Sequence, residues 1–468
     1  MRLDCHFIKT VKIMISAIIL LILLGSTPLS AQVRQTGATE AILTQINELL
    51  SASNFNEALA LFDTVDPAER NSSQLRLLRA SILSAAGKYT EARAIAEAVT
   101  KAEPKNIEAF FKLAAIEGAS GRQRQERTAL EAIIKIEPDN AEALIALGNA
   151  NLRNRAIKNG AAYFHRVFSK DPKNPGALLG LGRAFRMTGE HEEAERYLNR
   201  AVELYPNMAE ARSERARFFR SRGFLLNALN DLNEAKKAAP HDYWIAIDRA
   251  SVLLDMNRRS QALEEFNRAI EINPREFIAY VYSSGLKDDL GDFDGAEQDY
   301  AVLARLKPDY YFALEGLGLH KMRKEKWAEA RDAFMEAYKR AQNEHLYALM
   351  AAINWMRVEN ITSPRSYLSQ AQAKVKRDSL EWYMFRLYYD LTARNYMGEN
   401  DMVARLDQEK DQVLKARMLF YMAMYYDIRG NTALAEKYFV MVDGLNQKAI
   451  PEWRLNNWIM INRNLKTQ

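Results

Sequence analysis

Small and large apolar residues recur along the chain with a period of 34 residues. Alanine stands at one position of this period, from Ala58 to Ala330, and a large apolar residue stands four places later, from Phe62 to Phe334. A small residue, such as Gly148, precedes the alanine position by twelve places. Because residues three or four apart share one face of a helix, this spacing predicts two amphipathic helices in each period. The small residues would let the two helices approach closely.

Turn-forming residues separate the predicted helices at the same period. Proline stands at every 34th position from Pro104 to Pro308, where it would end the second helix. Glycine recurs at the expected turn between the two helices, for example at Gly189. Two residues after several of the prolines comes an asparagine or aspartate, such as Asn106 or Asp242, that could cap the next helix. A fixed period of about 20 to 50 residues predicts a solenoid of stacked repeats.

These markers and their spacing closely resemble the tetratricopeptide repeat. The resemblance implies an all-α fold, a right-handed superhelical solenoid of about eleven to twelve helix-turn-helix repeats that ends in a C-terminal capping helix. The regular array is expected over residues 39–344, which hold repeats one to nine. In residues 345–468 the period slips by three residues, which predicts divergent repeats and a capping helix over 451–465.

The divergent segment 345–468 also differs in composition. It contains ten of the 17 methionines and four of the six tryptophans. Two interpretations remain open. The segment is either a compact, aromatic-rich end of the array or an adaptable apolar surface for a partner.

The first 31 residues have the layout of a secretory signal peptide. Arg2, Lys9 and Lys12 give a basic start, an apolar run follows over 13–24, and small residues lead to Ala31. The apolar run is shorter than the roughly 20 residues that span a bilayer, which favours cleavage after Ala31 over an uncleaved membrane anchor. The protein is therefore expected to be exported to the periplasm or cell envelope of a bacterium.

Charge and cysteine content exclude several function classes. The formal net charge is +5, and loss of residues 1–31 would leave +3, which is nearly neutral for this length and lacks the whole-protein basic footprint of a nucleic-acid binder. Cys5 is the only cysteine and lies in the predicted signal peptide. The mature chain would therefore have no disulfide, cysteine nucleophile or thiolate metal site.

No catalytic motif is complete. His191 begins a segment like a zinc-protease motif, but residue 195 is glutamate where the second histidine should stand. Gly180 and Gly182 resemble part of a dinucleotide fingerprint, yet they fall inside a predicted helix with no strand before it. We therefore expect no catalytic residue, no cofactor and no metal site, and the protein is not expected to be an enzyme.

The resemblance also implies where a partner would bind. In the tetratricopeptide family the concave face is lined by the first helix of each repeat, at positions 2, 5, 9 and 12, with 13 at the edge. In repeats four to six this register selects a basic stripe of Asn149, Arg153, Arg183, Arg186, Arg217 and Arg220. In repeats seven to nine it selects three acidic residues and two aromatic anchors at position 2, which are Asp255, Asp288, Asp289, Trp244 and Phe312.

The pattern of these eleven residues favours a protein-interaction scaffold. Arginine binds carboxylates through two parallel hydrogen bonds, so a basic stripe beside an acidic one would orient an extended peptide of an envelope protein. A binding module for an anionic polymer, such as a glycan or nucleic acid, is the alternative. Ordinary solvated helix faces would also carry such charges. The sequence does not identify the partner or the oligomeric state.

Overall fold

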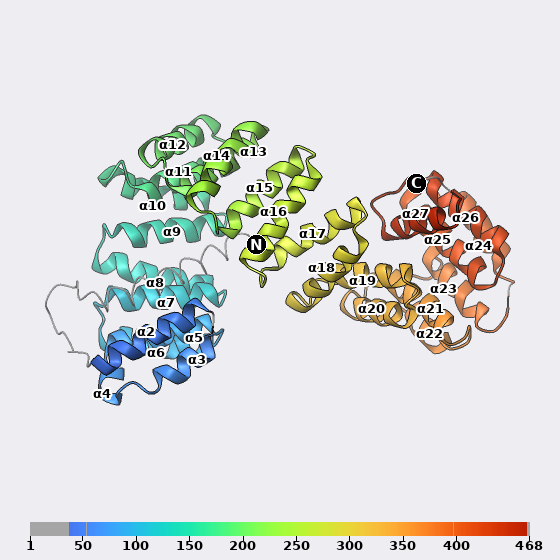
Figure 1. The fold of residues 1–468 in the computed structure, drawn as a ribbon, viewed down its shortest axis with the longest axis horizontal. Helices are drawn as coiled ribbons and strands as arrows, with labels where there is room; N and C mark the ends of the chain where they lie inside the picture. The colour runs from blue at the N-terminus through green and yellow to red at the C-terminus, as the bar shows by residue number, and fades with distance from the viewer. Residues whose placement is uncertain (1–36, 53, 396, 466–468) are drawn as a thin grey trace. The chain divides into compact units, whose positions relative to one another are not determined.

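The computed structural model describes residues 37–465 except 53 and 396, and it contains two compact units, Met1–Ala238 and Ala239–Gln468 (Figure 1). The predicted signal peptide, residues 1–31, lies outside the described residues. Unit 1 is therefore described from residue 37 onward, and unit 2 up to residue 465. In both units the described regular elements are α-helices, and consecutive helices pack as pairs. The predicted all-α solenoid of helix-turn-helix repeats is confirmed.

Unit 1 contains repeats one to six. Its helices are α2 (Gly37–Ser51), α3 (Phe55–Phe62), α4 (Pro67–Arg70), α5 (Ser73–Ala85), α6 (Tyr89–Ala102), α7 (Ile107–Ala119), α8 (Gln123–Ile136), α9 (Ala141–Arg153), α10 (Ile157–Lys170), α11 (Pro175–Thr188), α12 (His191–Leu204), α13 (Ala209–Ser221) and α14 (Leu225–Ala238). Apart from the short α4, these helices form six pairs, and neighbouring pairs stack on each other (Figure 1).

Unit 2 contains repeats seven to twelve and one further helix. Its helices are α15 (Tyr243–Asp255), α16 (Arg259–Ile272), α17 (Phe277–Leu290), α18 (Phe293–Leu306), α19 (Phe312–Arg323), α20 (Trp327–Arg340), α21 (Leu346–Val358), α22 (Arg365–Gln372), α23 (Leu380–Leu391), α24 (Glu399–Gln408), α25 (Gln412–Ile428), α26 (Thr432–Gly444) and α27 (Pro451–Asn462). Two divergent repeats, α21 with α22 and α23 with α24, follow the regular array, and Pro364 lies at the N-cap of α22.

The predicted stop and start signals act as expected. Each second helix from α6 to α18 ends two residues before its proline. After the proline, Asn106, Asn140 and Asn174 each accept a 3.0 Å hydrogen bond from the backbone N–H three residues on. Such caps satisfy a backbone donor that would otherwise lack a partner at the helix start. The helix boundaries are therefore fixed by local sequence.

The turn between the two helices of a repeat uses a left-handed residue, whether or not that residue is glycine. Gly189 has φ +84°, and Arg155 occupies the same position one repeat earlier with φ +61°. A side chain in this conformation costs free energy because its Cβ approaches the backbone too closely. Repeat four therefore contains a strained turn that repeat five avoids.

Replacing Arg155 with glycine is expected to stabilise unit 1. The left-handed strain disappears, and the larger entropy of the unfolded glycine offsets part of the gain, leaving about 0.5–1 kcal/mol. Urea unfolding of the two proteins measures the change. Gly189→Ala is the matched control with the opposite sign, because an added Cβ meets nothing within 4 Å and only the backbone strain changes. Destabilisation by Arg155→Gly would contradict the explanation.

Small residues at two positions of the first helix make room for one large side chain. Phe164 on α10 is fully buried, and a Cβ added to Gly148 on α9 or to Gly180 on α11 would lie 2.6 Å or 2.3 Å from its ring. The ring thus fills the space between the first helices of repeats four and five. Gly182 has the same relation to Leu198 in its own repeat, at 2.6 Å. These contacts explain the glycine pair that resembled a dinucleotide motif.

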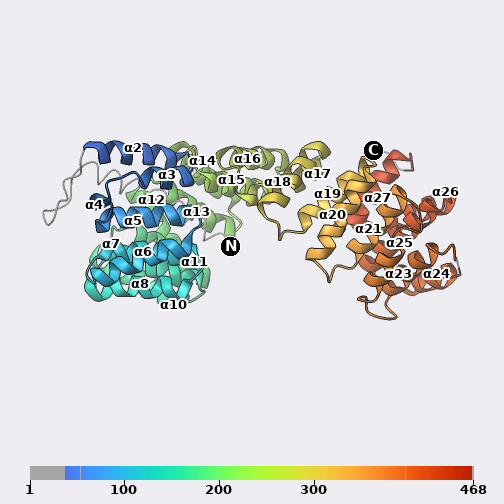
Figure 2. The same ribbon diagram turned by 90° about the horizontal axis from the view of Figure 1, so that it is seen from below.

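The largest apolar core lies in unit 2 and runs from Leu319 to Met460. It crosses residue 344, where the regular array was predicted to end, so the change in composition there does not interrupt the packing. The last helix, α27, packs on α26 as a capping helix would. It also packs on α25 and on α19, which lies three repeats earlier (Figure 2).

Candidate functional site

The predicted binding residues lie on the first helices of the repeats. Neighbouring first helices pack on each other, as α9 does on α11 and α11 on α13, so they form a continuous layer in unit 1. Residues one turn apart on such helices point to the same side of the layer. The predicted stripe of unit 1 occupies three consecutive first helices, with Asn149 and Arg153 on α9, Arg183 and Arg186 on α11, and Arg217 and Arg220 on α13.

Three of these arginines meet around a carboxylate that the sequence analysis did not select. The side chain of Glu214 on α13 is only 4% exposed. Arg217 Nη1 lies 2.7 Å from its Oε1, and Arg183 Nη1 lies 3.9 Å from the same atom. Burial raises the pKa of Glu214, but Arg217, Arg183 and Arg186 together lower it below its usual value. The carboxylate is therefore charged at neutral pH. In the sequence, only its spacing of three residues from Arg217 indicated that Glu214 could pair with an arginine of the stripe.

We call Arg183, Arg186, Arg217 and Glu214 the arginine cluster. The three arginines act on the buried Glu214 from α11 and α13, and a second carboxylate, Glu210, also lies close enough to raise its pKa. The buried Glu214 also holds the arginine side chains in place, which lowers the entropy that they would lose on binding an anion. The cluster is chemically suited to bind carboxylates.

The other members of the stripe have different surroundings. Arg153 forms an ion pair with the buried Glu126 of α8, so its charge is neutralised within the fold. Asn149 and Arg220 are partly buried on their helices. The structure thus brings together three of the six predicted residues of the stripe around one carboxylate.

The predicted acidic residues of unit 2 are held by internal partners or lie at the surface. Asp288 on α17 lies 3.0 Å from His320 Nε2 and 3.2 Å from Arg323 Nη1, and Tyr300 donates a 3.1 Å hydrogen bond to it. Burial raises the pKa of Asp288, but His320, Arg323 and Tyr300 more than reverse that effect. Asp289 forms a surface ion pair with Arg259 at 3.4 Å.

Asp255 and the two predicted aromatic anchors differ in exposure. Asp255 is exposed at the C-terminal end of α15. Trp244 is only 9% exposed and packs edge-on against Tyr243, whereas Phe312 is 47% exposed and stacks near Tyr311. Of the two anchors, Phe312 is therefore the one that presents a large apolar surface to solvent.

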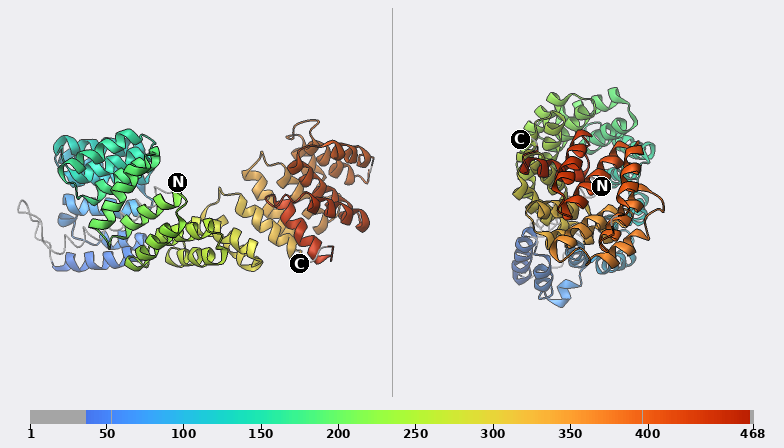
Figure 3. Two further views of the ribbon diagram at one scale, coloured as in Figure 1. Left: turned by 90° about the horizontal axis from the view of Figure 1, so that it is seen from above. Right: turned by 90° about the vertical axis from the view of Figure 1, so that its right-hand side faces the viewer.

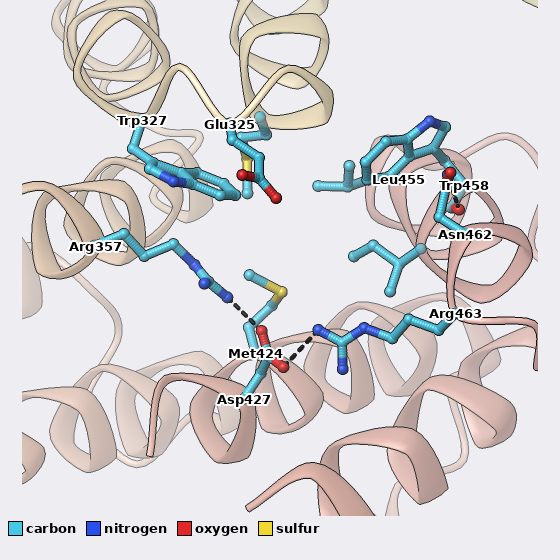
Figure 4. Close-up of a pocket in the computed structure, with 11 residues that line it drawn as sticks. Glu325, Trp327, Arg357, Met424, Asp427, Leu455, Trp458, Asn462 and Arg463 are labelled. Atoms are coloured by element: carbon cyan, nitrogen blue, oxygen red, sulfur yellow. Dashed lines mark hydrogen bonds and ion pairs between the residues drawn. The ribbon is translucent and has the colours of Figure 1, made fainter. Parts of the chain in front are cut away.

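Unit 2 also contains a pocket that sequence reasoning did not locate. Its volume is about 260 Å³, and its walls are Met322, Glu325, Trp327, Arg357, Met424, Asp427, Leu455, Trp458, Ile459, Asn462 and Arg463. Asp427 on α25 lies between the guanidinium groups of Arg357 and Arg463, with Arg463 Nη2 at 2.6 Å (Figure 4). The residues come from four segments that are distant in sequence, at 322–327, 357, 424–427 and 455–463. In the sequence, only the concentration of methionine and tryptophan after residue 345 indicated an apolar surface in this region.

A second polar group lies near this pocket, between α19 and α27. Glu315 on α19 accepts a 2.5 Å hydrogen bond from Tyr347 Oη. Burial raises the pKa of Glu315 to about 7, and the nearby Glu452 adds to the rise, while Tyr347, Arg417 and Arg454 oppose it. Glu315 is therefore partly protonated at neutral pH.

Stability of unit 2 is expected to fall as pH rises towards about 7. The pKa of Glu315 is higher in the folded protein than in the unfolded chain, so the folded protein binds this proton more tightly. The stabilisation that this gives the folded state is complete at pH values below the pKa of the unfolded chain, and it is lost as the pH rises through the pKa of the folded protein. Glu315→Gln is expected to raise the free energy of unfolding at pH 8 by about 1–3 kcal/mol, and by less at pH 5. Urea unfolding at both pH values measures this difference. Replacing the exposed Glu271 with glutamine is the control, and an equal effect of the two substitutions at pH 8 would contradict the prediction.

The described residues offer no metal site or membrane span. Between residues 37 and 465, with 53 and 396 left out, no three His, Cys, Asp or Glu side chains are grouped to hold a metal ion. Over the same residues, no helix combines the length and apolar character required to cross a bilayer.

Comparison with known proteins identifies the repeat. Two tetratricopeptide repeat family models match the chain, one at residues 49–116 and 152–217, the other at 247–311 and 286–345. The matches lie in both compact units. The search of curated proteins found no match.

Many solved structures are similar in fold. A tetratricopeptide repeat protein from Parabacteroides merdae is 17% identical, with a TM-score of 0.45 over 53% of this chain and 98% of that one. YrrB, described as a TPR protein with an unusual peptide-binding site, is 20% identical, with a TM-score of 0.34 over 40% and 96%. A TPR protein from Thermus thermophilus is 24% identical, with a TM-score of 0.35 over 39% and 100%.

Proposed function

We propose that this chain, which belongs to the tetratricopeptide repeat family, is a non-catalytic scaffold that binds segments of partner proteins on the first helices of its repeats. Tetratricopeptide repeats commonly bind proteins or peptides. The observation that carries the proposal is the arginine cluster, in which arginines of α11 and α13 lie close enough to the buried Glu214 to lower its pKa. A partner segment rich in aspartate and glutamate is the ligand that arginines on two neighbouring first helices are chemically suited to bind.

The position of the cluster supports a peptide as the ligand. Arg183 and Arg186 lie one turn apart on α11, and Arg217 lies on the neighbouring α13, so the positive charge extends over two repeats. An extended acidic segment can contact both repeats at once, whereas a single free carboxylate cannot. Because Glu214 already orders the arginines, binding loses less side-chain entropy.

The proposed site of action is the periplasm or cell envelope. Its support is the signal-like layout of residues 1–31, with a basic start, a short apolar run and small residues before Ala31. Fractionation of cells that express the tagged chain tests this part. Recovery of the chain in the cytoplasm with residues 1–31 intact would reject it.

A variant in which the whole arginine cluster is neutral tests the binding surface. Arg183, Arg186 and Arg217 are each replaced with glutamine together with Glu214→Gln, so no buried charge is left without a partner. Partners captured from the envelope fraction by the wild-type chain are identified by mass spectrometry. We expect the variant to lose these partners and to keep its helical circular dichroism. Unchanged capture would reject the arginine cluster as the binding surface.

Salt titration separates the two ligand classes that an arginine cluster could serve. Binding of an anionic polymer releases many counterions, so its affinity falls steeply as salt rises, whereas a short acidic segment with a few ion pairs responds weakly. We expect a weak response. A steep one would favour the glycan or nucleic-acid alternative.

A further inference from the structure

Helix α27 packs on the first helices of repeats nine and twelve, α19 and α25, as well as on α26. A helix that only caps the array would pack on the last repeat, α25 and α26. In this structure α27 also reaches α19, the first helix of repeat nine, and lies beside it in two views (Figures 2 and 3). The contact between α19 and α27 brings together residues more than 120 positions apart in the sequence.

The contacts of α27 fall on the positions that line the groove in this repeat family. On α25, Ala435 at position 20 of repeat twelve places Arg417, Met424 and Asp427 at positions 2, 9 and 12. Arg417 and Asp427 form ion pairs with α27, and Met424 lines the pocket beneath it. On α19, Met322 at position 12 lines the same pocket. The helix therefore lies where a ligand would lie.

The chemistry of α27 is complementary to this surface at both ends. Near its N-terminus, Glu452 accepts hydrogen bonds from Arg417 Nε at 3.0 Å and Tyr421 Oη at 3.1 Å. Just past its C-terminus, Arg463 Nη2 lies 2.6 Å from Asp427 Oδ1. Between them, Leu455, Trp458 and Ile459 form an apolar face towards the pocket. An acidic first turn and a basic end also match the helix dipole.

The packing beneath α27 is incomplete. The pocket of about 260 Å³ lies between α27 and helices α19, α20, α21 and α25 and is partly open to solvent, and its apolar walls lose packing contacts across that space. Among the described residues, Glu452 Oε2 and Asn456 Oδ1 are buried without a hydrogen-bond partner. A buried polar atom without a partner destabilises the docked state. Both atoms belong to α27, so a partner helix that filled the pocket and carried no such unpaired atoms would bind this surface more tightly than α27 does.

We propose that the inner surface of repeats nine to twelve binds an amphipathic helix of a partner protein, and that α27 covers this surface as an internal ligand until that helix displaces it. The partner helix carries an acidic residue in its first turn, an apolar face in its middle and a basic residue at its end. None of these residues belongs to the arginine cluster, so this proposal does not depend on the function proposed for that cluster.

The test uses the full chain with substitutions confined to α27, so that the surface beneath stays intact. Leu455→Asp with Ile459→Asp places two charges on the apolar face of α27 and is expected to release it. Ala449→Asp with Asn464→Asp adds the same charge at exposed positions on either side of the helix and is the matched control. The probe is a fluorescein-labelled synthetic peptide of residues 447–465 with the natural sequence.

We expect the released variant to bind the peptide at least tenfold more tightly than the wild type and the control, as measured by fluorescence anisotropy. Hydrogen exchange should speed up in residues 451–462 of the variant and stay slow in α19 and α25. Three results would overturn the proposal. In the first, the released variant would bind the peptide no better than the wild type does. In the second, hydrogen exchange would speed up throughout α19–α26, which would make α27 a structural cap. A wild-type dimer that the α27 substitutions dissociate would instead identify a second copy as the occupant.

Discussion

Replacing Phe164 with alanine is expected to lower the free energy of unfolding by about 3–5 kcal/mol, as for other fully buried phenylalanines. The ring is completely buried between Gly148 and Gly180, neither of which has a side chain that could move into the cavity. Urea unfolding followed by circular dichroism measures the loss. Phe224, which is 53% exposed in the same unit, provides the control, and its replacement should cost less than about 1 kcal/mol.

A double-mutant cycle with Gly180 tests the contact itself. Alone, Gly180→Ala would place a Cβ 2.3 Å from the Phe164 ring, so the substitution should destabilise the protein by about 1–3 kcal/mol. In the Phe164→Ala background the ring is gone, and the same substitution should cost little. Additive effects would contradict the packing of one ring between two repeats.

Reversing the charges of Arg183, Arg186 and Arg217 to glutamate is expected to destabilise unit 1 by about 3–5 kcal/mol. The substitutions leave the buried carboxylate of Glu214 surrounded by three further carboxylates. Breaking a buried ion pair from one side costs more than removing both partners, because the remaining charge stays desolvated. Thermal and urea unfolding of the purified variant measure the loss.

Two further variants separate this effect from a change in net charge. Lys101, Lys105 and Arg124 are exposed in unit 1. Replacing all three with glutamate changes the net charge by the same amount as the reversed cluster, but it leaves no buried charge without an ion-pair partner. That control should retain most of the stability. Adding Glu214→Lys to the reversed cluster inverts the arrangement of charges and should recover part of the loss. Equal stability of the reversed cluster and the control would show that Glu214 does not depend on these arginines.

The sequence predicted the repeats well because their signals are local. Proline, the capping asparagines and the turn glycines act within a few residues of their own position, so each helix boundary could be predicted without knowing the rest of the fold. The left-handed turn persists even at Arg155, where glycine is absent. The regular packing of small and large residues then fixes how one repeat stacks on the next.

The candidate site could be predicted only in part, because the sequence did not show which acidic and basic side chains pair with each other. The register selected Arg183, Arg186 and Arg217, but a register gives no information about which carboxylate lies beneath them. Glu214 stands at a position that holds glycine in the preceding repeat, so the periodic pattern did not single it out. Likewise Trp244 and Phe312 share one register position, yet one is buried and the other exposed.

The sequence by itself therefore determined the helices, their order and the family, because short-range patterns repeated every 34 residues encode each of them. Only the tertiary structure decided which charges are neutralised and where α27 lies. The docking of α27 on α19 depends on how the repeats between them, including the two divergent ones, pack on one another, and small differences in each add up along the array. Contacts such as Arg417 with Glu452, 35 residues apart, and Asp427 with Arg357, 70 residues apart, follow from how these helices pack and have no local signal.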